Sequence, residues 1–184
     1  MKKWKCVVVI AILLLTIGGI LLLHSKVKGR KNGRNEEIAV DISYVEVDSS
    51  YVTNPEGNLW DGSMKDSFWS SKGSEQSDET VTAKICLEQA YDVCRVELYP
   101  CIIEGEACYF PQDFTISVST NGEEWTKVYE IVGYKMKGTE KQEISFEVQT
   151  EIQHIRLQMM PVKEARGSDL FYVRLGEVVI FAEN

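Results

Sequence analysis

The stretch FPQDFTISVSTNGEEW, residues 110–125, decides the fold class of this chain. Within it, apolar residues alternate with hydroxyl residues over residues 114–119. A period of two places one set of side chains on a buried face of a strand and the other on a wet face. The Asn121-Gly122 pair that follows is typical of a type I′ hairpin turn, because both residue types tolerate positive φ. The stretch therefore predicts a strand, a tight turn and a second strand.

The same alternation recurs through the rest of the chain after Glu36. No stretch there sustains apolar residues at the helical spacing over three turns. We expect strands at residues 38–47, 81–87, 93–99, 114–119, 125–132, 144–148, 152–159 and 172–181. Short strands at this spacing favour an all-β sandwich or jelly roll. Residues 36–184 are long enough to bury an independent core.

Charge is unevenly distributed along the 184 residues, whose net charge is −8. Residues 1–35 contain eight basic residues and no acidic one, so residues 36–184 combine 12 basic with 28 acidic side chains, a net charge of −16. A field of that sign repels phosphate backbones and anionic headgroups. We therefore expect no nucleic-acid partner and no lipid binding driven by the charge of the body.

An apolar run, CVVVIAILLLTIGGILLL at residues 6–23, follows a basic flank at residues 1–5. As a helix it would cover about 27 Å, close to the thickness of a bilayer core. A cleaved secretory signal is the alternative, but the run ends in LLLHSK, which lacks a small-x-small cleavage site. We expect one transmembrane signal anchor, a basic polar tether at residues 24–37 and a folded body at residues 38–184.

Two rules conflict over the orientation of this anchor. Five Lys or Arg residues follow the span and three lysines precede it, so the positive-inside rule favours a cytoplasmic body. Four cysteines in the body favour an oxidising exterior instead. We expect a single-pass protein of the cell membrane whose C-terminal body is extracellular.

Residues 110–125 also resemble the central signature of discoidin, or coagulation-factor type C, domains, which bacterial family 32 carbohydrate-binding modules share. Further pieces are similar to the family's opening loop and strands, in the same order: WDGSMKDSFWSS (60–71), VTAKICL (81–87), VCRVELYP (93–100), HIRLQ (154–158) and VRLGEVVIF (173–181). The resemblance covers about residues 55–183. It implies a galactose-binding-like jelly roll with ligand-binding loops at one end of the sandwich, and it supports the extracellular location.

For ligand binding, the resemblance implies sugars in many members and proteins or lipid headgroups in others. Sugar-binding members commonly carry an Arg after the Pro that ends the third matched strand, whereas here that position is Cys101. The candidate sugar-binding residues near the expected loop end are Trp60, Phe68, Tyr109, Arg166 and Asp169. The alternative for the three aromatic residues is packing under the opening loop and over the core.

The resemblance also implies a structural calcium ion, because Asp61, Ser67 and Glu177 match the family's metal loop and its closing glutamate. Ser63 stands where the family often has Asn, and the loop is one residue longer. The candidate calcium ligands are therefore Asp61, Ser63, Ser67 and Glu177. The alternative is an ordinary Asx-type turn at Asp61, with Glu177 as an edge charge.

Cys6 lies in the apolar run, and the four remaining cysteines allow three pairings. Cys101 and Cys108 flank the loop CIIEGEAC, while Cys86 and Cys94 lie on consecutive predicted strands. We expect a disulfide between Cys101 and Cys108, and a second between Cys86 and Cys94 if the strand register allows it. Zinc binding is disfavoured because the chain lacks the C-x-x-C spacing of zinc modules. Free buried thiols are the remaining alternative to disulfides.

No catalytic motif accompanies these features. The two histidines are His24, beside the apolar run, and His154, inside a predicted strand, and the sequence has no nucleophile elbow, P-loop, Rossmann fingerprint or HExxH motif. We expect a membrane-anchored, non-catalytic module that recognises carbohydrate. The alternative is a structural or adhesion domain that binds another protein of the cell envelope. A hydrolase would need a site that the sequence does not show.

Overall fold

The computed structural model describes four stretches of the chain, residues 36–63, 66–136, 138–164 and 167–184. The predicted span at residues 6–23, most of the tether and Arg166 lie outside them. Within these stretches no helix is long and apolar enough to cross a membrane. Their one helical element is the short 3-10 helix η1 (Glu56–Leu59).

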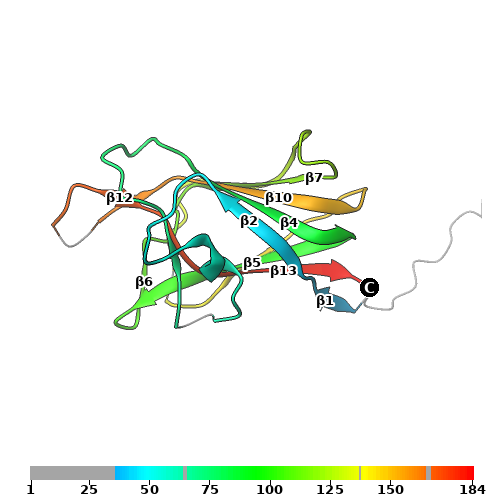
Figure 1. The fold of residues 1–184 in the computed structure, drawn as a ribbon, viewed down its shortest axis with the longest axis horizontal. Coiled ribbons are helices and arrows are strands. Elements are labelled where there is room, and N and C mark those ends of the chain that lie inside the picture. The colour runs from blue at the N-terminus through cyan, green and yellow to red at the C-terminus, as the bar shows by residue number, and fades with distance from the viewer. Residues whose placement is uncertain (1–35, 64–65, 137, 165–166) are drawn as a thin grey trace, which may run out of the picture. The chain divides into compact units, whose positions relative to one another are not determined.

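Two sheets pack face to face and enclose the core (Figure 1). Sheet A has the order β1-β13-β5-β6, with β3 beside β13 and β9 beside β5: β1 (Glu37–Ala39), β13 (Arg174–Glu183), β5 (Val93–Ile103), β6 (Glu106–Cys108), β3 (Trp69–Ser70) and β9 (Gln142–Ser145). Sheet B has the order β2-β4-β10-β7-β8: β2 (Ile42–Val47), β4 (Val81–Tyr91), β10 (Ile152–Met159), β7 (Phe114–Ser119) and β8 (Thr126–Ile131). A separate ribbon pairs β11 (Val162–Lys163) with β12 (Phe171–Tyr172).

The alternation seen in the sequence is the burial pattern of the strands. In β10, Ile155, Leu157 and Met159 are fully buried between the sheets, and in β5 Val96 is buried opposite Ile180 of β13. The predicted all-β sandwich is therefore confirmed. The expected first strand at residues 38–47 is divided into β1 and β2, which belong to different sheets.

Turn chemistry is where the sequence prediction fails in detail. β7 and β8 do form a hairpin, but six residues connect them, and Asn121 does not have the positive φ of a type I′ turn. Instead Ser119 Oγ and Asn121 Oδ1 accept backbone N–H groups of the connection. The two-residue turn with positive φ at both positions lies between β5 and β6, at Glu104 (φ 55°) and Gly105 (φ 84°).

The four described cysteines, Cys86, Cys94, Cys101 and Cys108, are free thiols in this structure. Cys101 and Cys108 are direct partners across the β5–β6 hairpin. Cys86 lies on β4 of sheet B and Cys94 on β5 of sheet A, because the chain passes from one sheet to the other between these strands. The condition for a disulfide between Cys86 and Cys94, a shared strand register, is therefore not met, because β4 and β5 do not pair.

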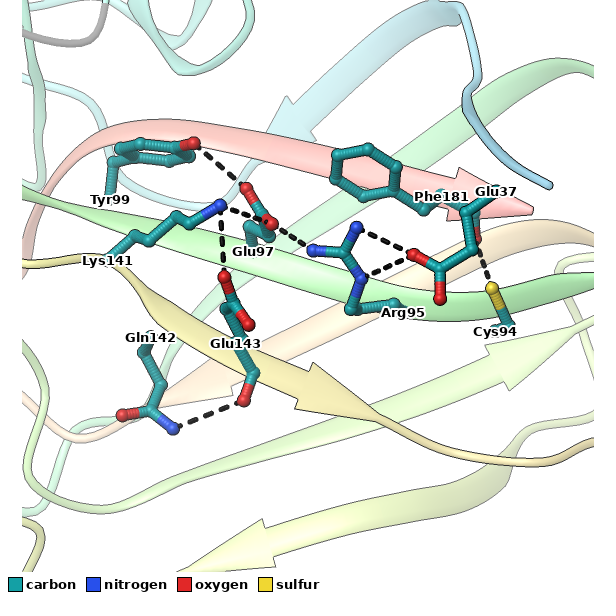
Figure 2. Close-up of polar contacts among 9 residues, drawn as sticks. All are labelled: Glu37, Cys94, Arg95, Glu97, Tyr99, Lys141, Gln142, Glu143 and Phe181. Carbon is teal, nitrogen blue, oxygen red and sulfur yellow. Dashed lines mark hydrogen bonds and ion pairs between the residues drawn. The ribbon is translucent and has the colours of Figure 1, made fainter. Parts of the chain in front are cut away.

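A buried carboxylate, Glu97, organises the outer face of sheet A (Figure 2). Its side chain is 2% exposed and accepts hydrogen bonds from Lys141 Nζ (2.5 Å), from the Tyr99 hydroxyl (2.9 Å) and from the Arg95 guanidinium. Burial alone would raise the pKa of Glu97, but these three donors together hold that pKa below its usual value. Arg95 also pairs with Glu37 of β1, so the network ties the edge strand and the segment before β9 to β5.

Replacing this carboxylate tests the network. We expect Glu97→Gln to lower the free energy of unfolding by about 3 kcal/mol, because Arg95 and Lys141 lose their buried partner. Above about pH 4.5 the full difference is present, and it shrinks as the pH falls through the lowered pKa of Glu97. Urea unfolding at several pH values measures both. Glu143→Gln is the control, since Glu143 is 56% exposed and its loss costs under about 1 kcal/mol.

Oxidation tests the hairpin. Directly opposed residues of an antiparallel pair have Cα atoms about 4.5–5.5 Å apart, a separation that disulfides span. We propose that a disulfide oxidant joins Cys101 to Cys108 and stabilises the fold by about 2–3 kcal/mol. Intact mass with and without reductant, together with melting curves, measures this. If the oxidant raised the melting temperature of the Cys101→Ser/Cys108→Ser double variant as much as that of the wild type, the proposal would be contradicted.

Candidate functional site

One end of the sandwich gathers the segments that sequence analysis singled out. Figure 1 shows β6 and β12 at this end, and β1 with the C-terminus at the opposite end. The backbone N–H of Asn184 donates to the carbonyl of Glu36, so the described body begins and ends at the same place. We call the end that carries β6 and β12 the loop end.

At the loop end an arginine is surrounded by aromatic rings. The guanidinium carbon of Arg174 lies over the rings of Tyr109, Tyr172 and Phe68, at 4.4, 5.0 and 5.6 Å from their centroids. Its Nε donates to Ser70 Oγ at 3.2 Å. All four side chains of this cluster are half-buried, and we call Phe68, Tyr109, Tyr172 and Arg174 the Arg174 platform.

Strand register positions the arginine. Leu175 pairs with Pro100 of β5, and Arg174 pairs with Ser70 of β3. Arg174 consequently lies near Cys101: burial raises the pKa of Cys101 to about 12, and the guanidinium opposes that rise. A cation therefore stands beside the position at which the discoidin pattern has Arg, although the neighbouring strand supplies it.

Backbone geometry holds the tyrosine in place. Tyr109 directly follows β6 and has φ 56°, a left-handed conformation that is uncommon outside glycine. Its carbonyl accepts the backbone N–H of Arg174 at 3.1 Å, and its ring packs edge-on against Tyr172. The two strand ends thus fix the ring relative to the guanidinium.

The predicted sugar-binding residues separate into groups. Phe68 and Tyr109 come together in the Arg174 platform, as their candidate role requires. Trp60 is half-buried and packs against the core, which agrees with the packing alternative. Asp169 is 97% exposed and pairs with Lys163 at 2.9 Å, while Arg166 lies outside the described residues.

Sequence analysis missed Tyr172 and Arg174. Both alternate with the buried residues Val173 and Leu175, so a period of two already placed them together on the outer side of the closing strand. That pattern was visible in the sequence, but nothing in it showed that the outer side faces Phe68 and Tyr109.

The predicted metal loop brings two carboxylates together. Asp61 accepts the backbone N–H of Ser63 at 2.8 Å and the Ser67 hydroxyl at 2.7 Å, which is the Asx-type turn considered above. Glu177, only 3% exposed, faces this turn. Burial and the Asp61 carboxylate raise the pKa of Glu177 to about 7, against the lowering effect of the Gly62 and Ser63 N–H groups.

This loop has oxygen ligands suited to a hard cation. Glu177 Oε2 is buried and has no hydrogen-bond partner among the described residues, so a strong acceptor is left unsatisfied. Carboxylate, hydroxyl and carbonyl oxygens are the ligands that Ca²⁺ prefers. No group of three or more His, Cys, Asp or Glu gathers anywhere in the described ranges, so hydroxyl or carbonyl oxygens must complete a site here.

His154, the histidine that an enzyme would need, lies on a strand of sheet B, whereas Arg174 and Glu177 lie on β13 of sheet A. It occupies β10, where its cross-strand partners are Cys86 and Ser119. Gly122 of the β7–β8 connection lies against the His154 ring, so that a Cβ atom at position 122 would be 3.5 Å from the ring atoms. His154 therefore belongs to the outer face of sheet B and not to the loop end.

Comparison with known proteins adds family and fold. No curated protein matches the sequence. Among solved structures, a family 32 carbohydrate-binding module from a family 31 glycoside hydrolase of Clostridium perfringens shares 21% identity, with a TM-score of 0.63 over 79% of this chain and 95% of that chain. The family 32 module of NanJ from the same organism, in complex with galactose, shares 16% identity, with a TM-score of 0.61 over 79% and 99%.

A third structure, a Clostridium perfringens family 32 module in complex with GalNAc-β-1,3-galactose, also shares 16% identity, with a TM-score of 0.61 over 79% of this chain and all of that one. At such identities the likeness shows a shared fold.

The family model for the F5/8 type C domain matches residues 41–168, which include the strand-turn-strand stretch at residues 110–125. This chain therefore belongs to the F5/8 type C, or discoidin, domain family.

Proposed function

We propose that this protein is a non-catalytic carbohydrate-binding module whose ligand binds at the loop end. The observation that carries the proposal is the Arg174 platform, in which three aromatic rings surround a guanidinium. Aromatic faces stack on the apolar faces of pyranose rings, and N–H donors orient sugar hydroxyls. Galactose in the NanJ module and GalNAc-β-1,3-galactose in the third structure are ligands of proteins with this fold.

Each group of the platform has a role in this proposal. Tyr109 and Tyr172, which meet edge-on, form the wall against which a sugar ring stacks. Arg174 donates hydrogen bonds to ring substituents, and its Nε is held in place by Ser70. Since Ser70 is buried, the guanidinium is positioned before the ligand arrives, which lowers the entropic cost of binding.

The position of the platform suits display on a membrane. The described body begins at the end opposite the loop end (Figure 1), and the basic tether precedes that beginning in the sequence. If residues 6–23 anchor the chain, the ligand-binding surface lies at the end of the body that the tether does not enter. A single-pass anchor is therefore part of the proposal, and the four cysteines of the body support placing that body on the extracellular side.

The second part of the proposal is a structural calcium ion bound in the loop that contains Asp61. The residues that would hold it are Asp61 and Glu177, with Ser63 and Ser67 of the same loop. Calcium would neutralise two facing carboxylates and satisfy the orphaned Glu177 Oε2. Because Phe68 follows this loop directly, an ordered loop also orders one ring of the platform.

One observation favours a second function. Tyr and Arg are the residues that most often dominate protein–protein interfaces, and the Arg174 platform is built from them. Docking of another cell-envelope protein through the same surface is therefore the alternative. Sugars compete with a ligand in the first case and have no effect in the second.

A glycan array followed by calorimetry, with residues 36–184, tests carbohydrate binding. We expect one class of glycan to bind, and Tyr109→Ala and Arg174→Ala each to weaken binding at least about tenfold through lost stacking or charged hydrogen bonds. Arg156→Gln is the matched control, since Arg156 lies on β10 of sheet B and stacks on Trp125 of the β7–β8 connection. An array without signal, or affinities that neither platform variant changes, would refute the proposal.

Thermal unfolding with calcium or a chelator tests the metal loop. We expect calcium to raise the melting temperature of the wild type, and Glu177→Gln to abolish that response while leaving the fold intact. A calcium response that survives in Glu177→Gln would show that the ion binds elsewhere.

The same carboxylate predicts a pH dependence without calcium. Because the pKa of Glu177 is raised to about 7, the folded state holds its proton more tightly than the unfolded state does. The free energy of unfolding should therefore fall as the pH rises from about 4.5 through about 7, and at higher pH the ionised Glu177 should cost about 3 kcal/mol. Glu177→Gln removes this fall, and chelator-treated samples unfolded in urea at pH 5 and pH 8 measure it.

A further inference from the structure

Arg174 has no anionic partner in the part of the chain that the structure describes. Among the described residues, the one hydrogen bond of its guanidinium is from Nε to the Ser70 hydroxyl, and it forms no ion pair. Arg95, by contrast, is paired with Glu37 and Glu97. No described residue accepts a hydrogen bond from the two terminal amino groups of Arg174, which are therefore available to a ligand.

The surroundings make this lack of a partner informative. Residues 36–184 contain 28 acidic side chains and have a net charge of −16, so carboxylates are abundant. One of them, Glu164, is close enough to accept the Tyr109 hydroxyl at 3.5 Å, yet it does not pair with Arg174. A half-buried cation attracts an anion more strongly than a fully hydrated cation does, because the local dielectric constant is lower.

The rings determine which part of the guanidinium a ligand meets. Three rings lie within 5.6 Å of its central carbon, and Nε is directed to Ser70. The remaining donors are the N–H groups of the terminal nitrogens, which lie in one plane. Planar paired donors match a carboxylate in bidentate fashion, and charge-assisted hydrogen bonds are roughly twice as strong as neutral ones.

We infer that the Arg174 platform selects sugars that carry a carboxylate, the chemical class of uronic and sialic acids, over neutral sugars. The inference rests on the proposed carbohydrate-binding function and specifies its ligand. The aromatic rings stack on the sugar ring whether or not it is charged, and Arg174 supplies the discrimination. Arg174 is therefore the specificity-determining residue of the site.

The test compares each acidic sugar with its own methyl ester, which keeps the shape and removes the charge. The probes are oligosaccharides of galacturonate, of glucuronate and of N-acetylneuraminate, with methyl galactoside as the neutral sugar and a galactose sulfate as a second anion. Calorimetry uses the full chain in detergent micelles. We expect one acid to bind about tenfold to a hundredfold more tightly than its ester.

Three variants locate the discrimination. Arg174→Gln should bring the acid down to the affinity of the ester while stacking still supports weak binding. Arg174→Lys should restore only part of the preference, because it keeps the charge and loses the paired donors. Arg156→Gln, which changes the arginine stacked on Trp125, should leave the preference unchanged.

The other outcomes separate this inference from the proposed function. Equal affinity for acid and ester in the wild type, with Arg174→Gln weakening both, overturns the inference and leaves carbohydrate binding in place. Preference for the sulfate over every carboxylate also overturns it. Absence of binding to all sugars refutes the proposed function itself, and the inference with it.

Discussion

The register of β13 on β5 is the constraint on which the rest of this structure depends. It places Ile180 opposite Val96 and Val178 opposite Leu98, so that the central strands of sheet A present an apolar inner face. A slip by one residue would turn every side chain of β13 to the other face of the sheet. The same register sets Leu175 against Pro100, and so brings Arg174 to Cys101 and the loop end.

Two buried glutamates on these neighbouring strands show how local partners decide a role. Glu97 has three donors, and its pKa is lowered, so it stabilises the outer face of sheet A in its ionised form. Burial and the facing Asp61 carboxylate raise the pKa of Glu177, and one of its oxygens has no hydrogen-bond partner among the described residues. The first is a completed structural network, whereas the second is costly on its own and suits a group that a cation completes.

Prediction from the sequence succeeded for elements that a period of two defines. The limits of β10 were predicted to the residue, and β7 and β8 were predicted as a hairpin. Prediction failed where a result depended on partners distant in sequence. Cys86 and Cys94 lie eight positions apart, but the chain crosses from sheet B to sheet A between them, and no local pattern shows that crossing.

The sequence by itself determined most of the long strands, the buried face of each and the acidity of the body, because alternation and charge are properties of adjacent residues. It misplaced β9, expected at residues 144–148 and found at Gln142–Ser145. Only the tertiary structure decided that Phe68, Tyr109, Tyr172 and Arg174 form one surface. These residues come from separate segments, and their distances depend on strand register and on the closure of the two sheets. Such non-local pairings are set by the packing of the whole core, which no short stretch of sequence encodes.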